Sequence, residues 1–167
     1  TWQGKKYWAK DDGTFYTGVC DINGKKYYFL EDGEQITKEG WYLTNGTYYW
    51  INKDTSLQTG WVKYDNNWYW MKEDGTMASS EWITYDKNRY YFRSWGGVYT
   101  GIHTIGGTKY AFQSWGGLYH DQTFTIGGKT YYANSDGTFA TGWVQNGGKT
   151  YYFDEDGMSR LSNGSIP

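Results

Sequence analysis

Pairs of neighbouring aromatic residues recur along the chain every 20 to 22 residues and set its pattern of apolar and polar positions. Each pair lies in a short segment rich in β-forming residues, with turn residues on both sides. No stretch repeats its apolar residues every 3.6 positions, so we expect no helix. Eight pairs mark the copies: Tyr7-Trp8, Tyr27-Tyr28, Tyr49-Trp50, Tyr69-Trp70, Tyr90-Tyr91, the degenerate Tyr110-Ala111, Tyr131-Tyr132 and Tyr151-Tyr152.

Glycines recur at two fixed distances from these aromatic pairs. One position lies six residues after the first aromatic, and the other lies nine residues before it, often followed by Trp. Self-similarity at a fixed short period is typical of repeat proteins. The glycines after the pair are Gly13, Gly33, Gly75, Gly96, Gly116, Gly137 and Gly157, and those before it are Gly18, Gly40, Gly60, Gly101 and Gly142.

Each copy predicts a β-hairpin. In one copy, we expect strands over residues 60–64 and 68–72, joined by a turn at residues 65–67. Sister copies place Asn23-Gly24 or Gly-Gly pairs at this turn, and such pairs favour tight hairpins because both central residues need positive φ. Asp74-Gly75 and its counterparts predict a second turn after the second strand.

A single hairpin is marginal in water, so successive hairpins must bury their aromatic faces on one another. The expected fold is an all-β solenoid of about eight β-hairpin repeats, in one array over residues 1–167. We expect a partial repeat over residues 1–17. Full repeats are expected to begin near residues 18, 40, 60, 81, 101, 122 and 142, with a polar tail at 163–167. Because the pattern is already under way at the first residue, we interpret the chain as a fragment whose partner domain lies N-terminal to it.

Composition indicates where the buried surface comes from and excludes several functions. The chain has 11 Trp, 19 Tyr and 7 Phe but a net charge of only -2, so we expect aromatic rings to supply the apolar burial. With this near-neutral charge, the chain lacks the excess of basic residues that attracts nucleic acid or anionic lipid. No apolar run approaches the roughly 20 residues that span a bilayer, so no membrane insertion is expected. Cys20 is the one cysteine, which excludes an internal disulfide.

Two positions vary between copies and are the candidates for a site: the residue after the opening glycine and the residue before the aromatic pair. Trp41 and Tyr48 lie seven residues apart across a tight turn, as do Trp61 and Trp68. This separation allows the two rings to face each other from opposed strands. The alternative is that these rings simply form the core of a protein poor in leucine.

A third aromatic wall and an apolar floor would enclose a small hollow between two such facing rings. The second ring of the following pair, Trp70 or Tyr91, would supply the wall, and Leu57 or Met77 would supply the floor. Three rings around a small hollow attract a quaternary ammonium ion through cation–π forces of about 0.5–2 kcal/mol per contact. The same rings would alternatively stack on the apolar face of a sugar.

The segments Thr-Gly-Trp-Val-Lys (59–63), Asn-Trp-Tyr-Trp (67–70) and Asp-Gly-Thr-Met-Ala-Ser (74–79) resemble a choline-binding, or cell-wall-binding, repeat. That family occurs in Gram-positive surface proteins, cell-wall hydrolases and phage lysins. The resemblance implies a left-handed solenoid that binds choline of teichoic acids between repeats, on a secreted or cell-surface protein. It also implies two sites, one with Trp61, Trp68, Met77 and Tyr91, and one with Trp41, Tyr48, Leu57 and Trp70.

Other copies depart from this pattern. The copy with Trp82 has Arg89, a cation where the cage needs a ring, and the copy with Trp143 has Thr150. Residues 22–29 and 126–132 are more similar to the glucan-binding repeats of streptococcal glucosyltransferases and to the carbohydrate-binding repeats of clostridial toxins. In those groups the implied ligand is a polysaccharide or a cell-surface glycan. Two Ser-Trp-Gly-Gly turns place Trp95 and Trp115 where exposed rings would suit a sugar.

The sequence predicts a non-catalytic binding module that needs no cofactor. Its acidic residues lie mostly in turns, and His103 and His120 are 17 residues apart without further ligands at metal-binding spacing. The expected partner is choline-decorated teichoic acid or polysaccharide, and the module would anchor a larger surface or secreted protein. The alternatives are a glucan- or host-glycan-binding module and a structural spacer. Two copies of the chain are also expected to be able to form a homodimer through the open, ring-rich end of the solenoid.

Overall fold

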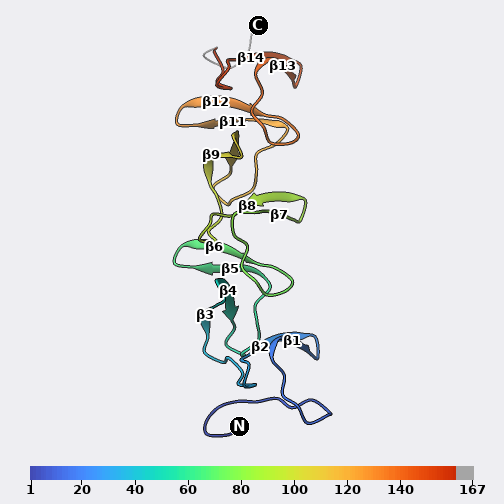
Figure 1. Ribbon diagram of the computed structural model, residues 1–167. Coiled ribbons are helices and arrows are strands. Elements are labelled where there is room, and N and C mark those ends of the chain that lie inside the picture. Colours follow the sequence, from blue (N-terminus) through green and yellow to red (C-terminus); the bar gives the residue numbers. More distant parts are fainter. Residues whose placement is uncertain (161–167) are drawn as a thin grey trace. The chain divides into compact units, whose positions relative to one another are not determined.

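The computed structural model describes residues 1–160, and every regular element among them is a β-strand (Figure 1). The expected all-β fold of repeated hairpins is confirmed, and the predicted tail at 163–167 lies outside the described residues. The strands are β1 (Gly18–Ile22), β2 (Lys25–Phe29), β3 (Gly40–Thr44), β4 (Thr47–Ile51), β5 (Gly60–Tyr64), β6 (Asn67–Met71), β7 (Trp82–Tyr85), β8 (Asn88–Tyr91), β9 (Gly101–Ile105), β10 (Thr108–Phe112), β11 (Gln122–Ile126), β12 (Lys129–Ala133), β13 (Gly142–Asn146) and β14 (Lys149–Phe153).

Each consecutive pair of strands forms its own two-stranded antiparallel sheet. In the β5–β6 hairpin, the turn consists of Asp65 and Asn66, both with positive φ (46° and 59°). Asn67 already pairs with Tyr64, so the expected start of the second strand at residue 68 was wrong by one residue. The two-residue turn fixes which side chains lie opposite each other.

After its second strand, each repeat turns and bridges back to the end of that strand. In the third full repeat the Gly75 N–H donates to the Lys72 carbonyl at 2.8 Å, and the Asp74 carboxylate accepts the Thr76 N–H at 2.9 Å. The predicted Asp-Gly turn is therefore present, closed by an aspartate that accepts a hydrogen bond from the backbone two residues on. The bridges are Phe29–Gln35, Ile51–Leu57, Met71–Met77, Phe92–Val98, Phe112–Leu118, Ala133–Phe139 and Phe153–Ser159.

The most deeply buried side chains lie two residues after the first aromatic of each pair. In five hairpins the residue opposite is a glycine, which leaves room above the sheet for the buried side chain. The expectation that rings alone supply the burial was incomplete, because this position also holds Ile, Met and Ala. Its occupants, each at most 1% exposed, are Phe29, Ile51, Met71, Phe92, Phe112, Ala133 and Phe153.

Main-chain hydrogen bonds link six of the bridged turns among residues 1–160 to the preceding repeat. The residue eight positions after the first aromatic donates its N–H to the carbonyl of the residue that stands before the preceding aromatic pair. Because the donors and acceptors are backbone atoms, this link does not depend on side-chain identity. The bonds are Gln35 to Lys6, Leu57 to Lys26, Met77 to Tyr48, Val98 to Trp68, Leu118 to Arg89 and Ser159 to Thr130, at 2.7–2.9 Å.

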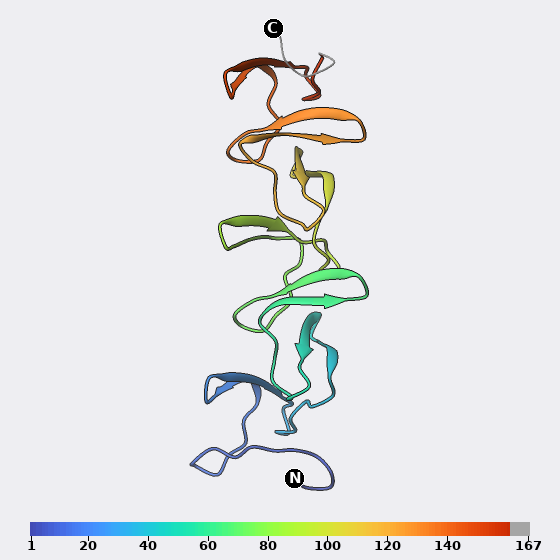
Figure 2. The same cartoon turned by 180° about the vertical axis from the view of Figure 1, so that it is seen from behind.

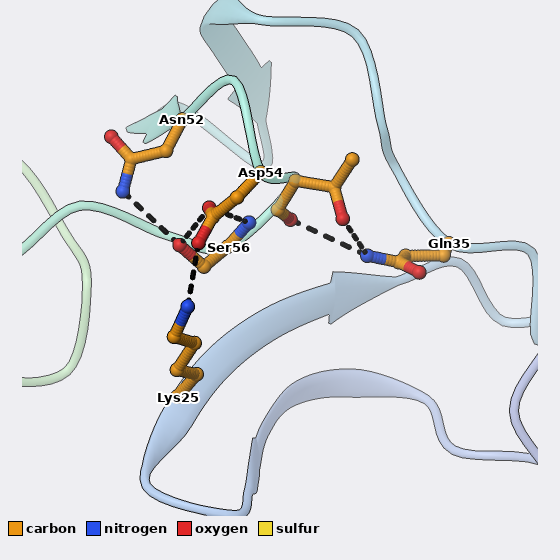
Figure 3. A network of polar contacts seen from close by, with 6 residues as sticks. Lys25, Gln35, Asn52, Asp54 and Ser56 are labelled. Atoms are coloured by element: carbon orange, nitrogen blue, oxygen red, sulfur yellow. Dashed lines mark hydrogen bonds and ion pairs between the residues drawn. The ribbon is translucent and has the colours of Figure 1, made fainter.

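Side chains add to this link between the first hairpins (Figure 3). The Lys25 ammonium, on β2, donates to the Asp54 carboxylate at 2.7 Å. Asp54 also accepts the Ser56 N–H at 3.0 Å, and the Gln35 amide donates to the Thr55 hydroxyl at 3.0 Å. The turn after β4 is thus held on both sides by residues of the preceding repeat.

The chain divides into two compact units, one of Thr1–Glu81 with Phe92–Val98, and one of Trp82–Tyr91 with the chain from Tyr99 onward. Within the first unit the β3–β4 hairpin runs at a steep angle to the β5–β6 hairpin, as both views show (Figure 1 and Figure 2). The single array over residues 1–167 and its repeat boundaries remain a prediction. No helix long and apolar enough to cross a membrane occurs among residues 1–160.

Candidate functional site

The Trp41 ring, on β3, lies at the centre of an aromatic cluster in the first unit. The Trp50 ring lies 5.0 Å away and the Tyr48 ring 6.0 Å away, both from β4 of the same hairpin. From the next hairpin, the Tyr69 ring lies at 4.9 Å and the Tyr64 ring at 6.1 Å. All four are steeply inclined to the Trp41 ring plane, a geometry in which aromatic edges meet aromatic faces. Two consecutive repeats therefore build one cluster.

The strand register explains which rings meet. Trp41 stands directly opposite Trp50, while Tyr48 stands opposite Leu43 and reaches Trp41 diagonally. The spacing argument found Tyr48 but missed Trp50. A strict two-residue turn at Asn45 and Gly46 would have identified it, because that turn places residues 41 and 50 opposite each other.

Met77 forms the floor of this cluster. Its N–H donates to the Tyr48 carbonyl at 2.9 Å, and its side chain belongs, with Tyr69, to the buried cluster against which Trp41 packs. We expected Met77 to accompany Trp61 and Leu57 to accompany Trp41. The structure instead brings Met77 to the Trp41 hairpin and bonds the Leu57 N–H to the Lys26 carbonyl, one repeat earlier.

Burial affects the phenol group of Tyr69 in this cluster. Tyr69 is 9% exposed, and burial raises the pKa of its phenol above the ordinary value. Its hydroxyl therefore stays neutral at physiological pH, and the ring presents an uncharged π face. Tyr48 is 39% exposed, so this side of the cluster is open to solvent.

A second cluster surrounds Trp61, on β5. Trp70 lies directly opposite at 5.1 Å, Trp68 lies at 6.0 Å, and Phe92 lies at 5.9 Å. The Val98 N–H donates to the Trp68 carbonyl at 2.9 Å, which repeats the bond between Met77 and Tyr48. Trp68 is 40% exposed. The expected pair of Trp61 and Trp68 is thus present, and Trp70, expected beside Trp41, stands in this cluster.

Tyr91, the remaining residue of the expected sites, belongs to the second unit. Its ring stacks on Tyr99 at 5.4 Å and lies 5.1 Å from Trp82, which stands opposite it in the β7–β8 hairpin. Trp82 also lies 5.1 Å from Tyr110 of the next hairpin. The second unit therefore contains an arrangement of its own around Trp82.

The turn residues Trp95 and Trp115 are exposed to 48% and 46%, as the sequence predicts. A Cβ added at Gly97 would come within 2.1 Å of the Trp95 ring, so this ring lies directly on the glycine backbone. Trp115 lies on Gly117 in the same way, and its indole N–H donates to the Gln113 amide oxygen at 3.1 Å. Both rings are held in place while about half of their surface faces solvent.

Titratable groups form no obvious reactive centre in the part of the chain that the structure describes. There, no three His, Cys, Asp or Glu side chains lie in a group that could hold a metal ion. A ring nitrogen of His103 lies 2.8 Å from the Thr100 carbonyl, and the ring stacks on Tyr99 at 3.9 Å. His120 lies 3.0 Å from the carboxylate of Asp121.

Solved structures of similar fold come from pneumococcal proteins. CbpJ from Streptococcus pneumoniae TIGR4 is 25% identical with a TM-score of 0.76, over 96% of this chain and 61% of that one. Choline binding protein F from S. pneumoniae is 27% identical with a TM-score of 0.70, over 89% of this chain and 49% of that one. The choline-binding domain of CbpL from S. pneumoniae is 25% identical with a TM-score of 0.63, over 91% and 87%.

The chain thus spans about half to three fifths of the first two of these proteins. A comparison with curated protein sequences found no match. The family model of the choline-binding repeat matches residues 123–164, and that of the putative cell wall binding repeat matches residues 21–34, 59–77 and 80–97, together more than half of the chain. These matches, together with hairpins that share aromatic clusters between consecutive repeats, show that this chain belongs to the choline-binding, or cell-wall-binding, repeat family.

Proposed function

We propose that this chain is a non-catalytic module that binds choline in aromatic cages between consecutive repeats. By doing so it would hold a larger surface or secreted protein on choline-bearing teichoic acid of a Gram-positive envelope. The observation that carries the proposal is the Trp41 cluster, in which rings from two consecutive hairpins surround one indole, with Met77 below. Membership of the choline-binding repeat family supports the choice of ligand.

The chemistry of the cluster suits a quaternary ammonium ion. Such an ion has no N–H to donate, so its recognition needs apolar contact and negative π faces rather than hydrogen-bond acceptors. Trp41, Tyr48 and Tyr69 offer such faces, and the Tyr48 and Tyr69 ring centres lie 6.0 Å and 4.9 Å from that of Trp41. Three contacts of about 0.5–2 kcal/mol each sum to about 1.5–6 kcal/mol, which corresponds to dissociation constants between about 80 mM and about 40 μM.

The Trp61 cluster supplies a second cage, with Trp68 in the place of Tyr48. Two weak sites on one chain raise the apparent affinity for a polymer that carries many cholines, because the second binding event becomes intramolecular. A repeating ligand such as teichoic acid would profit from this, whereas free choline would not. This difference is a reason to propose the polymer as the physiological partner.

The test is a calorimetric titration of the chain with choline. We expect saturable binding, and we expect Trp41→Ala to lower the number of cholines bound because the central ring of one cage is lost. Trp143→Ala is the matched control: Trp143 also follows an opening glycine but is 63% exposed and shares its hairpin with Thr150. Equal losses in both variants, or no choline binding by the unmodified chain, would refute the proposal.

A second candidate function is glycan binding, and the exposed rings of Trp95 and Trp115 favour it. Each ring lies against a glycine backbone with about half of its surface exposed, so it is available for stacking on a sugar ring. A parallel titration with dextran oligosaccharides separates the two functions. A dextran response that survives Trp41→Ala but is lost in Trp95→Ala would assign glycan binding to the turns.

A further inference from the structure

Arg89, on β8, occupies the hairpin position that Tyr48 holds on β4. Its backbone carbonyl accepts the Leu118 N–H at 2.8 Å, just as the Tyr48 carbonyl accepts the Met77 N–H. Arg89 is the residue before an aromatic pair, and the backbone around it follows the same repeat. The two side chains are therefore presented from equivalent positions.

The surroundings of Trp82 also match those of Trp41. An opposed ring lies at 5.1 Å from Trp82 (Tyr91) and at 5.0 Å from Trp41. A tyrosine from the next hairpin lies at 5.1 Å from Trp82 (Tyr110) and at 4.9 Å from Trp41. Leu118 takes the floor position of Met77 and is 3% exposed. The second unit has thus built the same cage, apart from one wall.

The Trp82 cage lacks the wall that the Tyr48 ring provides at Trp41, and the guanidinium of Arg89 lies in the space beside the missing wall. Its central carbon is 4.4 Å from the centroid of the Trp82 ring, whereas the Tyr48 ring centroid is 6.0 Å from that of Trp41. A cation over an indole face at this distance is the arrangement in which cation–π attraction acts. The guanidinium therefore reaches further over the indole than the tyrosine ring it replaces.

The far end of the guanidinium is also fixed. One terminal nitrogen donates to the Asp136 carbonyl at 3.1 Å, in the turn that follows β12. The carboxylate of Asp136 accepts hydrogen bonds from the hydroxyl and the backbone N–H of Thr138. These bonds hold the pKa of Asp136 below its ordinary value, and the positive charge of Arg89 makes a smaller contribution. A flat guanidinium that stacks on one group and donates to another is well suited to such a place.

We propose that Arg89 is a built-in occupant of the Trp82 cage and a specificity-determining residue that keeps external quaternary ammonium ions out of it. This inference rests on the proposed function, because it takes the Trp41 and Trp61 cages as the ones that bind choline. A cation tethered to the cage competes at a high effective concentration, and choline would have to displace it. The side chain of Arg89 thus determines whether the Trp82 cage can bind the ligand.

The next repeat shows that a cation at this position does not by itself fill a cage. Lys109 stands at the equivalent position, but its ammonium pairs with the Asp156 carboxylate at 3.3 Å. Ile102 takes the place of Trp82 there, and a cavity of about 250 Å³ lies between Ile102, Lys109 and Tyr131. The Trp82 junction thus differs from this one at both positions, and its own cation lies over the ring where Trp82 and Arg89 occur together.

The first experiment observes the arginine side-chain NMR signals of the unmodified chain, in which Arg89, Arg93 and Arg160 are the three arginines. We expect ring-current shifts of the Arg89 side-chain protons to low frequency, lost in Trp82→Leu, with the resonance assigned by its absence in Arg89→Tyr. These shifts should persist at choline concentrations that saturate the other cages. Unshifted Arg89 signals, or signals that move to the free position as choline is added, would overturn the proposal.

The second experiment counts bound cholines by calorimetry. Arg89→Tyr gives the Trp82 cage the wall that Tyr48 provides at Trp41, so we expect one additional choline, with an affinity within about tenfold of the others. Lys87→Gln, at the exposed turn of the same hairpin, is the charge-matched control and should leave the count unchanged. A folded Arg89→Tyr with an unchanged count would also overturn the proposal.

The two experiments separate failure of this inference from failure of the proposed function. A chain that binds no choline refutes the proposed function, yet the Arg89 shifts, measured without ligand, still decide whether the guanidinium occupies the cage. Circular dichroism of Arg89→Tyr shows whether the variant is folded, which both its choline count and its use in assigning the Arg89 resonance require.

Discussion

One residue position, the one before each aromatic pair, separates the copies by chemistry. It holds a ring in Tyr48 and Trp68, and it holds Thr130 and Thr150 in the last two copies. The backbone carbonyl at this position accepts the same hydrogen bond whether the side chain is Tyr, Trp, Arg or Thr. The side chain is therefore free to vary without loss of the link between repeats.

This freedom predicts that Tyr48→Thr folds but binds choline poorly. Threonine already stands at the equivalent position in two hairpins, so the melting temperature should change little. One ring wall is lost, and we expect the affinity of that cage to fall about 5- to 30-fold, which corresponds to about 1–2 kcal/mol. Calorimetry with choline checks the affinity. An unchanged affinity would show that Tyr48 is no wall of a cage.

At the same scale, sequence spacing could predict part of the site. The seven-residue separation was enough to bring Trp41 to Tyr48 and Trp61 to Trp68. It was not enough to place Met77, because the floor residue comes from a loop that folds back onto the preceding hairpin. Which loop folds onto which hairpin depends on packing between repeats, and a two-residue period within strands carries no such information.

At the scale of the element, the bridged turn is held by a glycine that lies on the floor residue of the preceding repeat. Gly137 has a φ of +87°, and a Cβ added there would come within 2.4 Å of the Leu118 side chain. Gly148, in the β13–β14 turn, has a similar φ of +75° but open space around it. A side chain at either position would be strained by the positive φ, and the two positions differ in the space around the added Cβ.

We therefore expect Gly137→Ala to be more destabilising than Gly148→Ala. Both substitutions carry the left-handed backbone penalty of about 1–2 kcal/mol. Gly137→Ala adds an overlap with Leu118, for which overpacked sites cost about 1–3 kcal/mol more. Chemical denaturation measures the difference in the free energy of unfolding. Equal destabilisation would mean that Leu118 moves aside at little cost.

The elements themselves were largely predictable, because hairpins are local structures set by turn residues and β-forming segments. The periodic Asn-Gly, Gly-Gly and Asp-Gly pairs predicted both kinds of turn. The second strand expected at residues 68–72 was displaced by one residue at each end, because β6 runs from Asn67 to Met71. The deeply buried position two residues after the first aromatic was missed. In the described hairpins it holds Phe in four copies and Ile, Met or Ala in the other three, so no single residue type marks it in the sequence. A glycine opposite it, as at Gly60, is the other indication.

At the scale of the whole molecule, aspartate-closed turns recur and make stability depend on pH. The Lys25 ammonium and the Ser56 hydrogen bonds hold the pKa of Asp54 well below its ordinary value of 3.8. Hydrogen bonds from Thr14 and Thr138 lower the pKa of Asp12 and Asp136 in the same way. A lowered folded-state pKa stabilises the fold above the unfolded-state pKa, and this stabilisation is lost as the pH falls through the folded-state value.

The melting temperature should thus be steady near neutral pH and decrease as the pH is lowered below about 4. Asp54→Asn should melt at a lower temperature than the unmodified chain at pH 7, and the difference should shrink in acid. Asp86→Asn, which removes a carboxylate at the exposed β7–β8 turn, is the control and should change the pH profile little. A difference for Asp54→Asn that is constant with pH would contradict this account.

The backbone bond between a bridged turn and the preceding repeat has a consequence for how such a chain changes over generations. Because donor and acceptor are main-chain atoms at the same repeat positions in six junctions of the described chain, a duplicated or deleted unit of about twenty residues finds its partner already in register. A one-residue insertion inside a strand would instead move its side chains to the opposite face. Recombination between whole units can therefore change the number of aromatic junctions in a single genetic step. On the proposed role of Arg89, a single codon would then switch an inherited junction on or off.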